Sequence, residues 1–249
     1  MSLWLLESEA LGVDPKKLID MTYSFSEATL HWPTAKPFAL ERVHEGVTPQ
    51  GYWYASFNYI GSEHVGTHLD APFHFAQGKW TTDQIPLDRT IGPAVAIDVR
   101  GKAEADRDYR LQVVDIRTWE RRHGKLPRRA IVLMHSGWGK FWGNRKSYFG
   151  TDQEGDVDKL RFPGFSKEAA EFLVKERGIN AVGIDTPSID YGASRDFIAH
   201  QIFAAANIPI LENVANLKRL PPKGATVFAV PMKIRGGSGA PLRIFAVLP

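Results

Sequence analysis

The stretch from position 64 to position 74 holds the densest set of chemically active side chains in the sequence. It reads His64-Val-Gly-Thr-His68-Leu-Asp70-Ala-Pro-Phe-His74, and it contains three of the chain's 8 histidines. Neutral imidazole nitrogens and carboxylate oxygens are the ligands that suit zinc, manganese and related divalent ions. A chance grouping of surface or capping residues explains one such histidine, but it explains the whole set poorly. The stretch therefore predicts a metal centre.

The spacing of these residues indicates how the chain must fold around an ion. His68 and Asp70 are two positions apart, so both project from the same face of an extended segment. In a straight strand, His64 and His68 would lie about 13 Å apart, too far to share one ion. Gly66 lets the chain bend between them, and Pro72 argues against one continuous helix. We expect a bent strand or loop that folds the ligands onto one ion.

A second pair of ligand-type residues, His200 and Glu212, lies far downstream. Glu212 follows the apolar run 208–211, at the carboxyl end of a predicted buried strand, where open α/β sheets place their ligands. His200 falls on the helix predicted before that strand. Taken alone, each of the two is more often a structural residue. Four histidines that stand alone in the sequence are expected to be structural or exposed: His31, His44, His123 and His135.

Apolar patterns predict strands that alternate with helices. Strands are predicted at Leu18–Phe25, Trp53–Ile60, Ala94–Val99, Ala130–His135, Ala181–Asp185, Ile208–Leu211, Thr226–Met232 and Leu242–Val247. Helices are predicted at Val113–His123, which Gly124 ends, at Lys167–Arg177, between Ser166 as N-cap and Gly178, and at Arg195–Ala206. The β–α–β order of the second half predicts an α/β core. The aromatic strands of the first half favour a more antiparallel sheet.

Residues 136–165 show neither a strand nor a helix period and are rich in glycine and aromatic residues. Long ordered excursions of this kind are often lids or binding loops, although a surface loop without a role explains the pattern equally well. We expect one domain over residues 1–249, with this excursion inside it.

Composition removes several classes of function. The 249 residues include no cysteine, which excludes disulfides, thiolate metal sites and a cysteine nucleophile. A net charge of +3 without a run of like charges argues against nucleic acid as a partner. No apolar stretch is long enough to span a membrane, and residues 1–13 lack the pattern of a signal peptide. We expect a cytoplasmic protein that acts on a small molecule, or a periplasmic one if a leader was removed. No GxSxG motif supports a serine hydrolase.

The motif HxGTHxDxPxH, matched without exception by residues 64–74, resembles that of the cyclase family, which includes bacterial arylformamidases (kynurenine formamidases) and isatin hydrolases. Weaker similarities lie at Gly183–Asp190, Ile210–Asn213 and Gly239–Arg243, so the resemblance extends from about Leu18 to Val247. It implies a swivelling β/β/α-type fold with a mixed sheet, in a homo-oligomer (dimer or tetramer). It also implies a divalent metal, zinc or manganese, as one or two ions.

Carried over by position, the resemblance assigns His64, His68 and Asp70 to a first ion. Asp70 would bridge to a second ion held by His200 and Glu212, and His74 would act in catalysis. The length of the excursion at 136–165 is more similar to the isatin-hydrolase-like branch of the family.

The expected reaction is hydrolysis of a small aromatic amide or lactam, such as an N-formylkynurenine-like formamide or an isatin-like cyclic amide, by metal-bound hydroxide. A bound ion lowers the pKa of its water to about 7, and His74 would carry the proton to the leaving nitrogen. Trp32, Phe73 and Trp80 are candidate walls for a flat substrate, although core packing explains them equally well. A metal-dependent lyase or cyclase acting on a small carbonyl compound remains an alternative. A non-catalytic binding protein is disfavoured by the intact ligand set.

Overall fold

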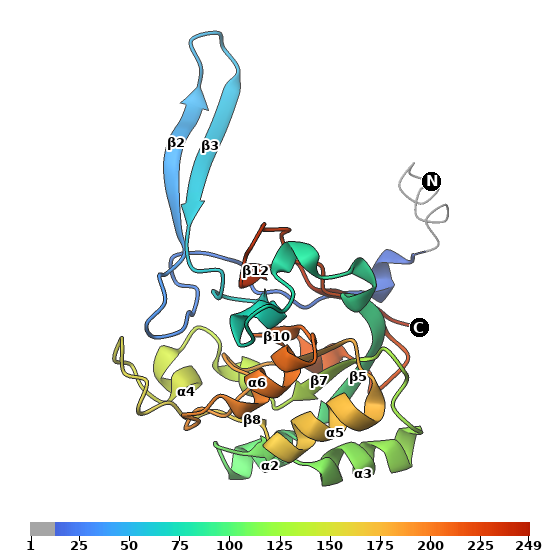
Figure 1. Cartoon of the computed structure of the whole chain (residues 1–249). Coiled ribbons are helices and arrows are strands. Elements are labelled where there is room, and N and C mark those ends of the chain that lie inside the picture. The colour runs from blue at the N-terminus through green and yellow to red at the C-terminus, as the bar shows by residue number, and fades with distance from the viewer. Residues whose placement is uncertain (1–12) are drawn as a thin grey trace.

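Nine strands form one mixed sheet in the computed structural model, which describes residues 13–249 (Figure 1). In spatial order they are β1 (Leu18–Asp20), β13 (Phe245–Val247), β11 (Thr226–Phe228), β5 (Ile91–Asp98), β7 (Ile131–His135), β9 (Ala181–Ile184), β10 (Ile210–Glu212), β4 (His68–Asp70) and β12 (Gly239–Pro241). The four central strands, β5, β7, β9 and β10, run parallel, and the flanking strands pair antiparallel. The sheet thus confirms an α/β core with antiparallel additions.

Helices cover one face of the parallel strands. They are α2 (Arg100–Ala105), α3 (Val113–His123), α5 (Lys167–Arg177) and α6 (Ile198–Ala205). The bounds of α3 and α5 are as predicted. Ser166 accepts a hydrogen bond from the backbone N–H of Ala169, and Gly178 takes the left-handed conformation that ends α5. The predicted helix Arg195–Ala206 begins later, because Phe197 has a left-handed backbone.

Side chains of the parallel strands point alternately to the two faces of the sheet, and each face has its own apolar core. Val132 and Met134 of β7 face the helices, where they meet side chains such as Phe203. Ile131 and Leu133 face the other way, into a core that includes residues of β1, β4, β11 and β13. The sheet therefore curls so that its own outer strands cover the face that carries no helix.

Strands β2 (Ala39–Val47) and β3 (Trp53–Ile60) form a separate two-stranded sheet, here called the arm. Figure 1 shows the arm standing away from the rest of the molecule. The bounds of β3 are as predicted, whereas β2 was not predicted. Charged residues and a bulge between Arg42 and His44 interrupt the alternation of β2.

The excursion at 136–165 has secondary structure and a core of its own. It contains a short 3-10 turn at Trp138–Phe141, α4 (Arg145–Phe149) and β8 (Gly164–Phe165), which pairs with β6 (Arg110–Leu111). Its aromatic side chains form a small core of their own with Leu30. The segment is packed structure, and its aperiodic pattern reflects packing from several directions rather than along one face.

Other predicted strands are shorter in the structure. Leu18–Phe25 is a strand only to Asp20, Thr226–Met232 only to Phe228, and Leu242–Val247 begins at Phe245. The N-terminal stretch that lacks a signal-peptide pattern lies almost wholly outside the described residues. From residue 13 onward, no helix has the length and apolarity to cross a membrane.

Candidate metal centre and its pocket

Strands β4 and β10 bring two predicted ligands face to face. They pair antiparallel with His68 opposite Glu212 and Asp70 opposite Ile210. Directly opposite residues in such a ladder lie on the same face of the sheet. The segment that carries the motif is thereby joined to the carboxyl end of β10, although the two are far apart in the sequence.

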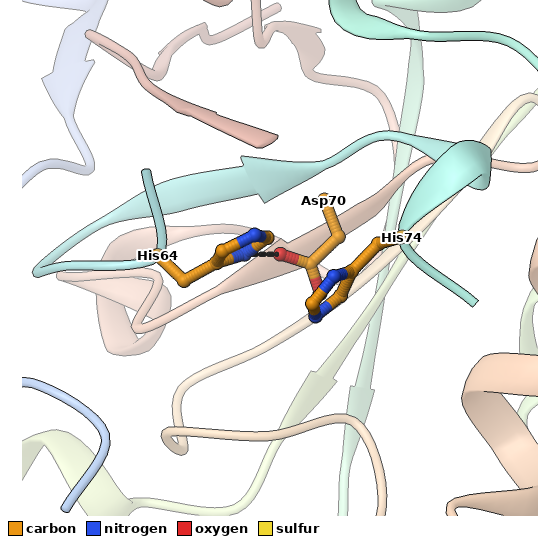
Figure 2. Close-up of side chains that lie close together, drawn as sticks. All are labelled: His64, Asp70 and His74. Carbon is orange, nitrogen blue, oxygen red and sulfur yellow. Dashed lines mark hydrogen bonds and ion pairs between the residues drawn. The ribbon is translucent and has the colours of Figure 1, made fainter. Parts of the chain in front are cut away.

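Two glycines allow His64 to join this pair. Gly66 has φ +58°, and a Cβ there would lie 2.9 Å from carbon atoms of Phe25 and Thr29, so the bend predicted at Gly66 is confirmed. Gly239, on β12, lies so close to His64 that a Cβ would approach its Cε1 to 2.5 Å. The His64 side chain consequently turns back over Asp70, with Nδ1 2.6 Å from Oδ1 (Figure 2).

His200 reaches the same place from helix α6. The buried carboxylate of Asp190 accepts hydrogen bonds from the backbone N–H groups of Ala199 and His200 and, at 2.7 Å, from His200 Nδ1. That bond fixes the orientation of the ring. Its other nitrogen, Nε2, lies 3.3 Å from Asp70 Oδ2 and 3.1 Å from Glu212 Oε1.

The hydrogen bonds of His68 and His64 show which nitrogen of each ring carries a proton. His68 Nδ1 donates to the carbonyl of Gly66, while its Nε2 is buried without a hydrogen-bond partner. Ser238 Oγ donates to Glu63, so it accepts from His64 Nε2 at 3.0 Å. When either ring is neutral, therefore, the nitrogen that faces the carboxylates is the one without a proton.

Unprotonated imidazole nitrogens and carboxylate oxygens repel one another unless a proton or a cation lies between them. His68 Nε2 lies 3.2 Å from Asp70 Oδ1 and 3.4 Å from Glu212 Oε2, all within a buried cluster. Nitrogen and carboxylate donors in this arrangement suit a divalent ion. The residues present thus fit the metal that the sequence predicts.

Asp70 stands at the centre of the cluster, and its two oxygens face different histidines. Oδ1 faces His64 and His68, while Oδ2 faces His200. Two groups have ligand atoms within 4.8 Å of one another: His68, Asp70 and Glu212, and His64, Asp70 and His74. The structure therefore brings together every residue that the sequence assigned to metal. It also places His74, which the sequence assigned to catalysis, close enough to His64 and Asp70 to bind the same ion.

The charges in the cluster shift pKa values in opposite directions. Burial alone lowers the pKa of His68, but the adjacent carboxylates of Asp70 and Glu212 outweigh it and raise that pKa to about 10. Burial raises the pKa of Asp70, yet the neighbouring histidines hold it well below its usual range. The ion-free cluster thus keeps Asp70 ionised and draws protons onto His68 and His200.

His74 differs from the other histidines of the motif. It follows β4 in a 3-10 turn that Pro72 begins, and its ring stacks on His64 at a centroid distance of 4.0 Å. Figure 2 shows both rings beside the Asp70 carboxylate. His74 is exposed at its outer edge, yet desolvation by its neighbours, together with the charges of His64 and His200, lowers the pKa of its ring to about 4. The imidazole is therefore neutral at pH 7.

Comparison with known proteins identifies the family. A family model described as a putative cyclase matches residues 19–191. The chain belongs to the cyclase family. It is 34% identical to an isatin hydrolase of Roseibium aggregatum over 75% of this chain and 72% of that protein. It is 30% identical to a kynurenine formamidase of Salinibacter ruber over 91% of this chain and 95% of that protein.

The structure of isatin hydrolase A from Ralstonia solanacearum is similar over 100% of this chain and 98% of that one, with a TM-score of 0.86 and 31% identity. This likeness confirms the mixed α/β fold that the resemblance implied. The chain is accordingly a metal-dependent hydrolase of the cyclase family.

A pocket of about 300 Å³ opens onto the metal centre of this cyclase-family chain. Its apolar walls are formed by Trp32, Ala35, Phe75, Pro187 and Phe197. None of the described residues that line it is an arginine or a lysine. The pocket therefore offers aromatic faces to a substrate and no positive side chain other than histidine.

Of the three predicted wall residues, the structure places only Trp32 in this pocket. Phe73 is exposed, and Trp80 lies beside Arg89. Because the 3-10 turn interrupts strand alternation after Asp70, Phe75 rather than Phe73 turns toward the metal ligands. The four solitary histidines do not line this pocket.

Several residues that hold the site in place were not predicted. Asp190 lies within a segment that supported the family resemblance, but its role depends on the approach of helix α6. Ser238 and Glu63 orient His64 across 174 positions of sequence. The glycine-rich run around Ser238 signals an unusual backbone, although nothing in it indicates a histidine as its neighbour.

Proposed function

We propose that this hydrolase opens the C–N bond of a cyclic aryl amide, an isatin-type lactam. The observation that carries the proposal is the pocket: aromatic walls, no arginine or lysine, and a floor of metal ligands. Its 300 Å³ lies at the small end of ligand pockets, which suits two fused rings. The isatin hydrolases among the relatives support the same substrate class.

The residues of the pocket supply the remaining chemistry. Zinc or manganese, held by His64, His68, Asp70, His200 and Glu212 as one or two ions, would provide an acidic water and polarise the carbonyl. Trp32 and Phe197 orient a flat ring. His74, neutral at pH 7, accepts a proton from the attacking water and returns it to the departing nitrogen. Water thus adds OH to the carbonyl carbon and H to nitrogen, which yields an aryl amine and a carboxylate.

An aryl formamide is a second candidate substrate, because kynurenine formamidases match a larger share of the chain than the isatin hydrolase does. The bond broken is again an aryl C–N amide bond. N-formylkynurenine, however, carries an amino-acid group, and this pocket has no arginine or lysine to pair with its carboxylate. This comparison favours the lactam.

The test is a substrate panel on protein with measured metal content, with zinc and with manganese, before and after chelation. The panel contains isatin, N-formylkynurenine and formanilide, which shares the formamide bond but lacks the amino-acid group. We expect chelator-sensitive turnover of isatin well above that of N-formylkynurenine. Faster turnover of N-formylkynurenine would overturn the lactam assignment. No turnover of any of them by metal-loaded protein would favour the lyase or cyclase alternative.

A further inference from the structure

Ser188 is a residue of the substrate pocket whose hydroxyl has no partner within the described protein. It lines the pocket together with the metal ligands. The residue is only 3% exposed, and its Oγ makes no hydrogen bond to any of residues 13–249. A buried hydroxyl without a partner lowers the stability of the fold, so its presence in a native pocket requires an explanation.

The metal centre explains one unpartnered atom of the pocket but not this one. Among the buried side-chain atoms without a partner in residues 13–249, two belong to the pocket, His68 Nε2 and Ser188 Oγ. His68 Nε2 faces Asp70 and Glu212, where an ion would satisfy it. A neutral serine hydroxyl is not among the usual ligands of zinc. The partner of the Ser188 hydroxyl is therefore expected in the space that the substrate enters.

The backbone around Ser188 is held in place from both sides. Thr186 Oγ1 donates a hydrogen bond to the carbonyl of Ser188 at 2.8 Å. The N–H of Ile189 donates to Oε1 of the metal ligand Glu212, also at 2.8 Å. The serine is thus fixed next to the metal centre while its own side chain stays free. A positioned polar group of this kind in an otherwise apolar pocket gives specificity to binding.

The isatin-type lactam carries one polar atom more than its hydrolysis uses. The scissile carbonyl and the ring nitrogen take part in the reaction, whereas the ketone oxygen on the adjacent ring carbon does not. Because the ketone neighbours the scissile carbonyl, it lies at the same end of the ring and close to the metal ligands. It accepts hydrogen bonds, and the Ser188 hydroxyl can donate one. Each group would be buried without a partner if the other were absent.

We propose that Ser188 determines specificity by donating a hydrogen bond to the ketone oxygen beside the scissile amide carbonyl. The inference rests on the proposed function and narrows its substrate class to cyclic aryl amides with a ketone next to the amide. A plain aryl formamide has no such ketone, so it leaves the hydroxyl unpaired in the complex. A site built around a polar contact discriminates against substrates that lack the matching group.

The first test compares Ser188→Ala with the wild type, at equal measured metal content, on isatin and on formanilide. The KM for isatin should rise about tenfold, the effect of one lost hydrogen bond. Its kcat should change little, because the contact exists both before and during the reaction. The KM for formanilide should stay within about twofold, since formanilide lacks the ketone.

An equal loss on both substrates, or an unchanged KM for isatin, would overturn the role of Ser188. A wild type that does not turn over isatin would instead overturn the proposed substrate, so the two failures are distinguishable.

The second test measures stability without any substrate. Ser166→Ala is the matched control: Ser166 is also 3% exposed, but its Oγ accepts a hydrogen bond from the N–H of Ala169. Its loss should lower the Tm, whereas Ser188→Ala should melt at or above the wild type, because it breaks no internal hydrogen bond. Circular dichroism follows the melting of both variants. A Tm for Ser188→Ala as low as that of Ser166→Ala would reveal a partner inside the protein and overturn the proposal.

Discussion

The metal centre and the arm differ in the kind of surface that is left without a partner: polar atoms in the centre and apolar side chains on the arm. In the centre, buried donors and acceptors hold each other in place: Asp190 fixes His200, and Ser238 fixes His64. What remains open there is a set of nitrogen and oxygen atoms that only a proton or a cation satisfies. On the arm, the backbone ladder between β2 and β3 is complete, and what remains open is apolar area. A cation would satisfy the polar atoms of the metal centre, whereas only an apolar surface would cover the exposed face of the arm.

This difference predicts how substitutions act. A change in the centre removes a ligand or its support, so its effect should appear in metal content and turnover. A change on the apolar face of the arm touches none of these ligands, so metal content should stay as in the wild type. The predictions below test whether the two regions separate in this way.

The largest expected effect comes from Asp70→Ala. Among the predicted ligands, Asp70 is the carboxylate that faces all three histidines His64, His68 and His200, so its loss should abolish metal binding and reduce turnover to background. Elemental analysis of the purified variant measures the metal directly. Asp98→Ala is a suitable control, because Asp98 also ends a parallel strand but lies exposed beside Arg100. Full metal occupancy in Asp70→Ala would contradict the ligand assignment.

His74→Ala should slow turnover about a hundredfold, the lower range for a general acid–base group, while metal remains bound. The expectation follows from its neutral ring at the pocket wall and from the two anchored histidines that can hold an ion without it. Metal content and kcat are measured on the same sample. Loss of metal together with activity would instead make His74 a ligand, as its distance to His64 and Asp70 allows.

The parts of this site that could be predicted from the sequence are those encoded locally. The ligands at 64–74 lie on one bent segment, and Gly66 signals the bend. Helices α3 and α5 carry their own end signals, and their bounds were predicted correctly. Each of these features depends on contacts within a few residues.

The remaining features depend on contacts between distant segments. Ser238 meets His64 because β12 pairs with β4, and no local pattern encodes that pairing. Phe75 replaces Phe73 as a pocket wall because a single 3-10 turn changes the direction of the side chains. The side chains of the aromatic excursion at 136–165 pack in several directions, so its apolar residues show neither a helix nor a strand period. Strand pattern predicted β3, while the apolar face that β3 shares with β2 becomes visible only once the two strands are paired.

Metal affinity should rise with pH. In the ion-free protein the pKa of His68 is raised to about 10, so this ring is protonated at neutral pH and a metal must displace the proton. Between about pH 6 and pH 8 the apparent affinity should increase about tenfold per pH unit for each proton released. Competition with a chromophoric chelator measures this. The same shift means that His68 stabilises the ion-free fold most below pH 6.5 and loses this contribution as pH rises through about 10. A metal affinity that does not change with pH would show that His68 carries no proton for the metal to displace.

The smallest predicted effect concerns the support of His64. Ser238→Ala removes the hydroxyl that connects His64 to Glu63, without removing any ligand. Metal affinity should fall about tenfold, the lower range for a residue that orients a ligand, and kcat of fully loaded protein should change little. Ser56→Ala, the same substitution on the polar face of the arm, should leave affinity unchanged. A metal affinity in Ser238→Ala equal to that of the wild type would show that this hydroxyl does not orient His64.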